Sequence, residues 1–187
     1  EEQLIKDIYS RMSKLDPTNI DLHQNLAEKF IEDGNKAEAK DEIIAVIRGF
    51  LAKENVKEAQ KQISTLESIS TEEDVFFAKG LIARAEENYP EAEGFFRKVL
   101  AKSPYFVEAY YELGLTRLKS GKKQQAKIAF QHCLQYNQEY IPALEFFGDY
   151  NKEEGKNQWA IDKYQKAASV ALKKSRFKDA ERILKKV

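Results

Sequence analysis

The sequence has a single cysteine, Cys133, which excludes an internal disulfide framework. It has only two histidines, His23 and His132, and neither has a cysteine or a second histidine at metal-ligand spacing. Neither a Gly-x-Gly-x-x-Gly motif nor a phosphate-binding loop occurs. We therefore predict a protein that is not an enzyme, with no metal and no cofactor. The cysteine is expected to pack in the core, and the histidines to pack or to lie at the surface.

The sequence also lacks net charge and long apolar runs. It has 31 basic and 31 acidic residues, so it has no basic footprint for nucleic acid. Its longest aliphatic run, residues 43–47, is far shorter than the roughly 20 residues that span a bilayer. The opening "EEQLIKDIYS" has no signal-peptide pattern. We expect no nucleic acid partner, no membrane insertion and, given the single cysteine, a reducing, cytoplasmic location.

The sequence does contain an internal repeat. Hydrophobic residues make up 42% of the chain, enough for a sizeable core. Four kinds of position recur every 34 residues. They are Gly80, Gly114 and Gly148; Ala92, Ala126 and Ala160; Phe96, Phe130 and Tyr164; and Gly121 and Gly155. Such a period indicates stacked structural units, each too small to bury its own apolar faces.

Each period has the apolar spacing of two helices. Tyr110, Leu113, Gly114 and Leu118 line one helical face, which ends at Gly121. The next face carries Ala126, Phe130, Cys133 and Leu134. We therefore predict two antiparallel helices joined by a tight turn. The small residue of the first helix should let the second approach closely.

This pattern resembles the tetratricopeptide repeat (TPR), a helix–turn–helix unit of about 34 residues. Residues 73–104 match it through Phe76, Gly80, Tyr89, Ala92, Phe96 and Pro104. Residues 107–140 match through Tyr110, Leu113, Gly114, Gly121, Ala126 and Phe130, with Gln138 where proline is usual. Residues 141–172 match through Phe147, Gly148, Gly155, Ala160 and Tyr164. The resemblance implies an all-α, right-handed α-solenoid of stacked antiparallel helix pairs.

Two segments depart from the regular period. The alanines at 39 and 59 lie 20 residues apart, as do those at 160 and 180. We predict one long helix over residues 36–53 and another over 157–174. The first would be shared by overlapping repeats at 19–53 and 40–70, and the second by repeats at 141–172 and 161–187.

The proposed repeats account for nearly the whole chain. Residues 1–15 resemble a half repeat, so we treat residues 1–187 as a single array of about eleven helices. Neither end shows the polar cap that solenoids normally need. We therefore expect the chain to be an excerpt of a longer protein.

The resemblance also implies a concave groove lined by the first helix of each repeat. The side chains that face the groove are those three residues before, one residue after and four residues after the small residue of that helix. These positions select Gln24, Glu28 and Ile31; Phe77, Leu81 and Arg84; Tyr111, Leu115 and Leu118; and Glu145, Asp149 and Lys152. Phe77, Leu81, Tyr111, Leu115 and Leu118 would form an exposed apolar patch with carboxylates on both sides.

We therefore predict a protein-interaction scaffold whose groove binds a protein or peptide segment with apolar anchors and some basic character. A carboxylate clamp for chaperone C-termini is not expected, because its paired lysines and asparagines are missing. One alternative is self-assembly, since residues 173–187 hold seven basic and two acidic residues while residues 1–45 are acidic overall. The others are a groove covered by a neighbouring helix or a second copy, and a docking region of a larger enzyme.

Overall fold

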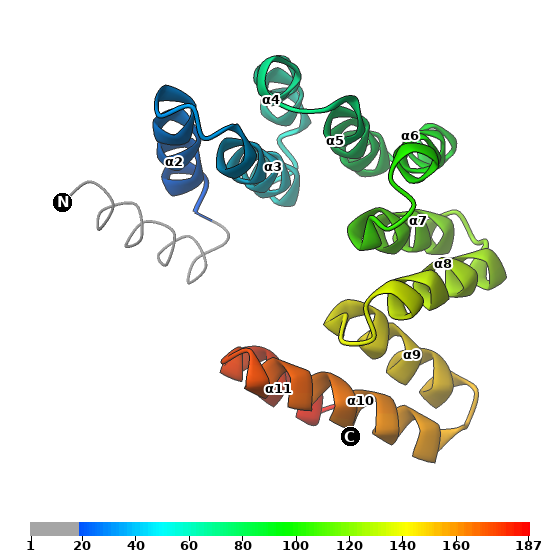
Figure 1. Ribbon diagram of the computed structural model, residues 1–187. Helices are drawn as coiled ribbons and strands as arrows, with labels where there is room; N and C mark the ends of the chain where they lie inside the picture. Colours follow the sequence, from blue (N-terminus) through cyan, green and yellow to red (C-terminus); the bar gives the residue numbers. More distant parts are fainter. Residues whose placement is uncertain (1–18) are drawn as a thin grey trace. The chain divides into compact units, whose positions relative to one another are not determined.

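The computed structural model describes residues 19–187, and every regular element in that range is an α-helix (Figure 1). These elements are α2 (Ile20–Glu32), α3 (Lys36–Ala52), α4 (Val56–Ile69), α5 (Glu72–Ala85), α6 (Tyr89–Lys102), α7 (Val107–Lys119), α8 (Lys123–Tyr136), α9 (Ile141–Glu153), α10 (Asn157–Lys173) and α11 (Phe177–Leu184). The predicted all-α class is confirmed. The half repeat predicted at residues 1–15 lies outside the described residues.

The helices form two compact units. One ends at Pro104 and contains α2 to α6, and the other, Tyr105–Val187, contains α7 to α11. Within each unit every helix packs against the next one along the chain. Because tight turns join α2 to α3, α5 to α6, α7 to α8 and α9 to α10, these helices form the antiparallel pairs that the repeat predicts.

The two predicted long helices are confirmed: α3 and α10 are each a single helix of 17 residues. A residue with positive φ precedes and follows each of them. Gly34 (φ +73°) and Glu54 (φ +57°) flank α3, and Gly155 (φ +70°) and Ser175 (φ +56°) flank α10. This left-handed residue is a common way to end a helix before a tight turn. Each long helix is thus joined by similar turns to a helix on either side. The division into overlapping repeats stays a prediction.

Within each regular pair, a glycine of the first helix lies against an aromatic ring of the second. A Cβ atom at Gly114 would lie 2.7 Å from the ring of Phe130, and one at Gly148 would lie 2.4 Å from the ring of Tyr164. Both rings are almost completely buried. The repeating glycines are therefore packing residues, because a side chain there would push the two helices apart.

This packing predicts opposite effects for two Gly→Ala substitutions in helices. Gly114→Ala should lower the free energy of unfolding by about 1–3 kcal/mol, because the buried ring of Phe130 must move. Gly94→Ala is the matched control, since no atom lies within 4 Å of a Cβ there. It should raise the free energy of unfolding by about 0.5–1 kcal/mol through helix propensity. Urea unfolding measures both, and equal effects would contradict the proposed contact.

Candidate interaction surface

The second unit contains an apolar strip along one face of α7. Tyr111, Leu115 and Leu118 recur at helical spacing, so they lie on the same side of the helix. All three are partly buried and pack at the edge of a cluster formed by α7, α8 and α9. The ring of Tyr111 lies 5.6 Å from the rings of both Phe130 and Tyr140, measured between centroids. We call these three residues the α7 strip.

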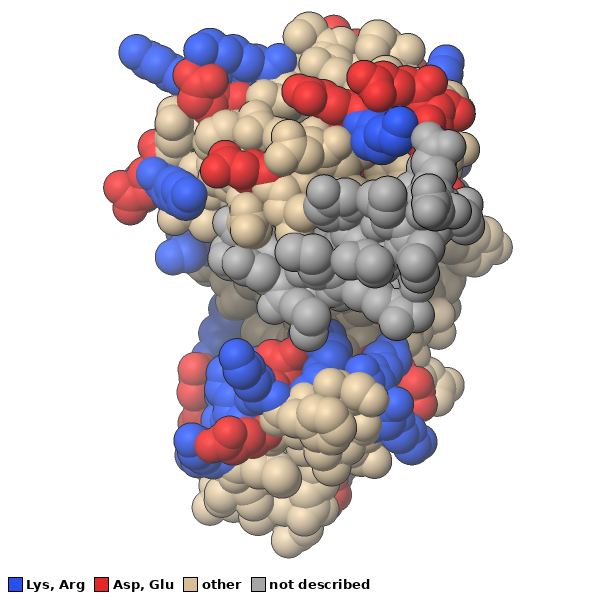
Figure 2. Space-filling view, turned by 90° about the vertical axis from the view of Figure 1, so that its left-hand side faces the viewer, with Lys and Arg blue, Asp and Glu red and all other residues tan. Residues whose placement is uncertain are grey.

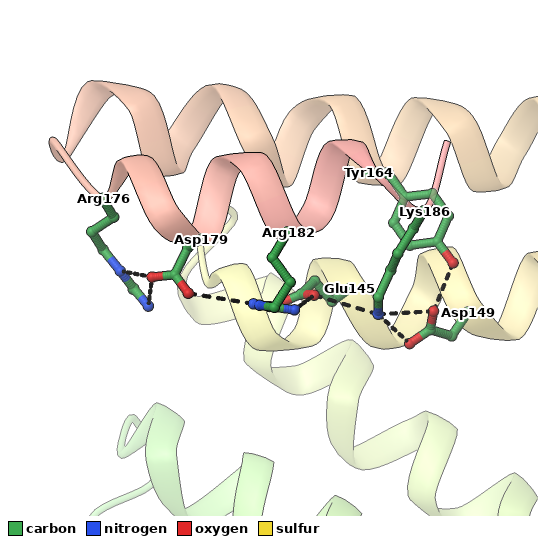
Figure 3. A network of polar contacts seen from close by, with 7 residues as sticks. All are labelled: Glu145, Asp149, Tyr164, Arg176, Asp179, Arg182 and Lys186. Atoms are coloured by element: carbon green, nitrogen blue, oxygen red, sulfur yellow. Dashed lines mark hydrogen bonds and ion pairs between the residues drawn. The ribbon is translucent and has the colours of Figure 1, made fainter. Parts of the chain in front are cut away.

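Two carboxylates of α9 bind basic side chains of α11 and of the turn that follows it, in the same unit (Figure 3). Arg182 donates two hydrogen bonds to Glu145, at 2.5 and 2.9 Å. Lys186 donates to both oxygens of Asp149, at 3.1 and 3.0 Å. The hydroxyl of Tyr164 donates to Asp149 at 2.6 Å. These five residues form what we call the α9–α11 network.

The network shifts the titration of two of its members. Its hydrogen bond to Glu145 raises the pKa of Arg182 above the usual value for a guanidinium. Burial, followed by the hydrogen bond to Asp149, raises the pKa of the Tyr164 hydroxyl. Both groups therefore keep their protons throughout the physiological range. The ends of Arg182 and Lys186 remain partly open to solvent, so salt should weaken these ion pairs.

The structure corrects the expected exposed patch at α5. Phe77 is 2% exposed and Leu81 is 1% exposed. The ring of Phe77 packs edge-on against that of Phe96, with centroids 5.9 Å apart, and the guanidinium of Arg48 lies 5.6 Å from its centroid. Ile82 is buried beside Leu81, so α5 is covered on more than one face. Both side chains are core residues of the first unit rather than exposed anchors.

The other predicted groove residues are divided between the two units. In the first unit, Glu28 and Ile31 are exposed on α2, Gln24 is partly buried there, and Arg84 is partly buried at the end of α5. In the second unit, α9 carries an exposed Lys152, whose Nζ donates to the carbonyl of Lys186 at 2.9 Å. The predicted groove residues of α7 and those of α9 thus share the second unit, while the others belong to the first.

The intramolecular partners of Glu145 and Asp149 were not predicted from the sequence. The excess of basic residues at 173–187 could have indicated that this segment binds carboxylates. The spacing was more specific, because Arg182 and Lys186 are four residues apart and so are Glu145 and Asp149. In Figure 2, Lys and Arg side chains gather over the lower part of the view, at the level of α10 and α11 in Figure 1.

The described residues offer little for catalysis. Cys133 is buried, and burial raises the pKa of its thiol to about 12, so it is not a nucleophile at neutral pH. His23 is buried and its Nδ1 lies 2.5 Å from a carboxylate oxygen of Glu42. Among residues 19–187, no group of three or more His, Cys, Asp or Glu side chains is arranged to hold a metal ion. No helix in this range has both the length and the apolar character of a membrane span.

Comparison with known families supports the interpretation of the repeat. The family model of the tetratricopeptide repeat matches residues 107–140, the segment that contains α7 and α8. None of the curated proteins matches the sequence. The resemblance to the tetratricopeptide repeat family is therefore confirmed, and its clearest repeat is the one that carries the α7 strip.

Solved structures of tetratricopeptide repeat proteins share the fold. A tetratricopeptide repeat protein from Parabacteroides merdae is 15% identical, with a TM-score of 0.65, and the match covers 97% of this chain and 77% of that one. MamA is 18% identical, with a TM-score of 0.52 and coverage of 91% and 89%. YrrB, described as a TPR protein with an unusual peptide-binding site, is 14% identical, with a TM-score of 0.53 and coverage of 93% and 97%. At these identities the likeness shows the fold alone.

The α9–α11 network predicts a salt-sensitive contribution to stability. Arg182→Glu should lower the free energy of unfolding by about 1 kcal/mol at low salt, because it places two carboxylates side by side. The loss should shrink in 1 M NaCl through screening. Lys185→Glu is the control, since within residues 19–187 the ion pair of Lys185 is with Glu181, four residues earlier, and not with α9. If both variants lose the same stability, measured by thermal unfolding at the two salt concentrations, the contact between helices contributes nothing specific.

Proposed function

We propose that this chain, which has the tetratricopeptide repeat fold and carries such a repeat at residues 107–140, is a non-enzymatic scaffold that binds a segment of another protein. The observation that carries this proposal is the α7 strip. Tyr111, Leu115 and Leu118 are partly exposed on one face of a helix. Aromatic and aliphatic side chains in such an arrangement are typical anchors of protein interfaces.

The partner segment should combine apolar anchors with some basic character. In this unit Glu145 and Asp149 already bind an arginine of α11 and a lysine four residues later, in the turn after that helix. This contact indicates which chemistry the face of α9 accepts. A basic partner that reached these carboxylates would compete with Arg182 and Lys186. Its apolar anchors would then supply most of the affinity, and its charges would set orientation and association rate.

The scaffold role also agrees with the scarcity of candidate catalytic groups among the described residues. The thiol of Cys133 is buried and protonated, and residues 19–187 hold no metal-ligand cluster. YrrB, which shares the fold, is described as having a peptide-binding site. A peptide-binding role for this chain is therefore the function that the α7 strip supports best.

Affinity capture from a lysate of the source cell tests this function. Tyr111→Ala/Leu115→Ala should lose a partner that the wild-type chain retains, because a few anchors dominate an interface and truncating one of them costs about 2 kcal/mol or more. Because Tyr111 packs on Phe130, circular dichroism must show that the variant keeps its helix content. Leu118→Gln, at the end of α7, gives a second test with less core disturbance.

Leu172→Ala/Leu184→Ala is the matched control. These leucines are about half exposed in the same unit, at 50% and 49%, and lie away from α7 on α10 and α11. The control should capture the same partner as the wild type. Equal recovery by wild type and all variants would exclude the α7 strip as the binding surface.

A further inference from the structure

A second face of α9 opens onto a pocket of about 410 Å³ that the predicted groove does not include. The pocket lies within the second unit and is lined by Lys127, Phe147, Tyr150, Asn151, Lys156, Trp159 and Lys163. Its α9 residues, at positions 147, 150 and 151, differ from the carboxylates that bind α11. We call it the Lys–Trp pocket. Its volume is in the range of sites that hold a small ligand or a side chain.

The charge of this pocket has one sign. Its lining includes three lysines and no carboxylate. Lys127, Lys156 and Lys163 form no ion pair within the described part of the chain, in contrast to Lys123, which binds Glu153 at 2.7 Å. The ammonium of Lys127 lies 4.6 Å from the centroid of the Tyr150 ring. Three unpaired lysines around one cavity attract an anionic ligand.

Aromatic rings form the apolar part of the pocket. Phe147 and Tyr150 are 8% and 7% exposed and belong to the packed interior. Trp159, the only tryptophan of the chain, is 67% exposed at the pocket wall. An indole is among the side chains most enriched in the energetic centres of interfaces. The pocket therefore offers an apolar surface next to its positive charge.

Asn151 adds a polar group that lacks a partner. The residue is 9% exposed, and its side chain forms no hydrogen bond with the other described residues. Its main-chain carbonyl accepts a hydrogen bond from the amide of Lys156 at 2.8 Å. The amide atoms of Asn151 are not completely shielded from solvent, so water or a ligand can bind them from the pocket. An amide side chain can donate to and accept from a peptide group at the same time.

We propose that the Lys–Trp pocket is a second docking site, which binds an acidic peptide segment carrying one apolar side chain. The apolar side chain packs against Trp159, carboxylates on either side bind the lysines, and Asn151 pairs with a peptide group of the segment. No lining residue is shared with the α7 strip, and Phe147, which lines the pocket, also belongs to the cluster on which that strip packs. A tetratricopeptide repeat with two such surfaces would hold two partners of opposite charge.

The fluorescence of Trp159 gives a direct test, since no other tryptophan contributes. The intact chain is titrated with capped pentapeptides Glu-Glu-X-Glu-Glu in which X is Phe, Leu or Ile. At least one should shift the emission with a Kd below about 1 mM. Two matched peptides test the chemistry: Gln-Gln-X-Gln-Gln removes the charges, and Glu-Glu-Ser-Glu-Glu removes the anchor. Each should bind about tenfold more weakly or not at all.

Variants locate the site. Lys127→Gln/Lys163→Gln and Asn151→Leu should each weaken binding about tenfold while the chain stays folded. Lys173→Gln/Lys178→Gln removes the same charge outside the pocket and should leave the affinity unchanged. The proposal is overturned if no acidic peptide shifts the emission at millimolar concentration, or if the neutral peptides bind equally well. It is also overturned if the control variant loses as much affinity, or if an oligothymidine binds better than the peptides, which would indicate a general polyanion surface.

Discussion

The contact between a glycine of one helix and an aromatic ring of the next sets how closely each regular helix pair packs. A methyl group at Gly114 or Gly148 would lie well inside the contact distance of a buried ring. The ring therefore fills the space that a side chain would otherwise take, and the two helices are held at one separation. This constraint explains why the helix glycines and the aromatic residues opposite them recur every 34 positions. It also holds α9 in place, so that its remaining faces can carry other groups.

In the second unit one ring connects packing with electrostatics. Tyr164 packs on Gly148 through its ring and donates through its hydroxyl to Asp149. Asp149 in turn binds Lys186, in the turn after α11. The helix contact that defines the repeat thus also orients a carboxylate of the α9–α11 network. The Lys–Trp pocket, by contrast, is positively charged. Its three lysines, with Trp159 and Asn151, lie around another part of α9 and α10. Separation of these charges on one rigid scaffold is what would allow two different segments to bind.

Much of the fold could be predicted from the sequence because it depends on local periodicity. The 34-residue period identified the glycine contacts, and the 20-residue intervals identified the long helices α3 and α10. The surface was harder to predict. A helical face shows which side chains point the same way but not what covers them, so Phe77 and Leu81 were expected to be exposed and are buried. The Lys–Trp pocket was not predicted, because its lining comes from α8, α9, α10 and the turn between the last two, and periodicity does not show which of their side chains meet.

The central claim is that the α7 strip contacts a segment of another protein, and site-specific photocrosslinking tests it most directly. Leu118 is replaced by benzoylphenylalanine, and a second variant carries the same group at Leu172, which is half exposed on α10. After irradiation in a lysate of the source cell, we expect a discrete crosslinked protein from position 118. The same protein should be absent from position 172. Identical products from both positions, or none from position 118 in a chain that remains folded, would contradict the claim.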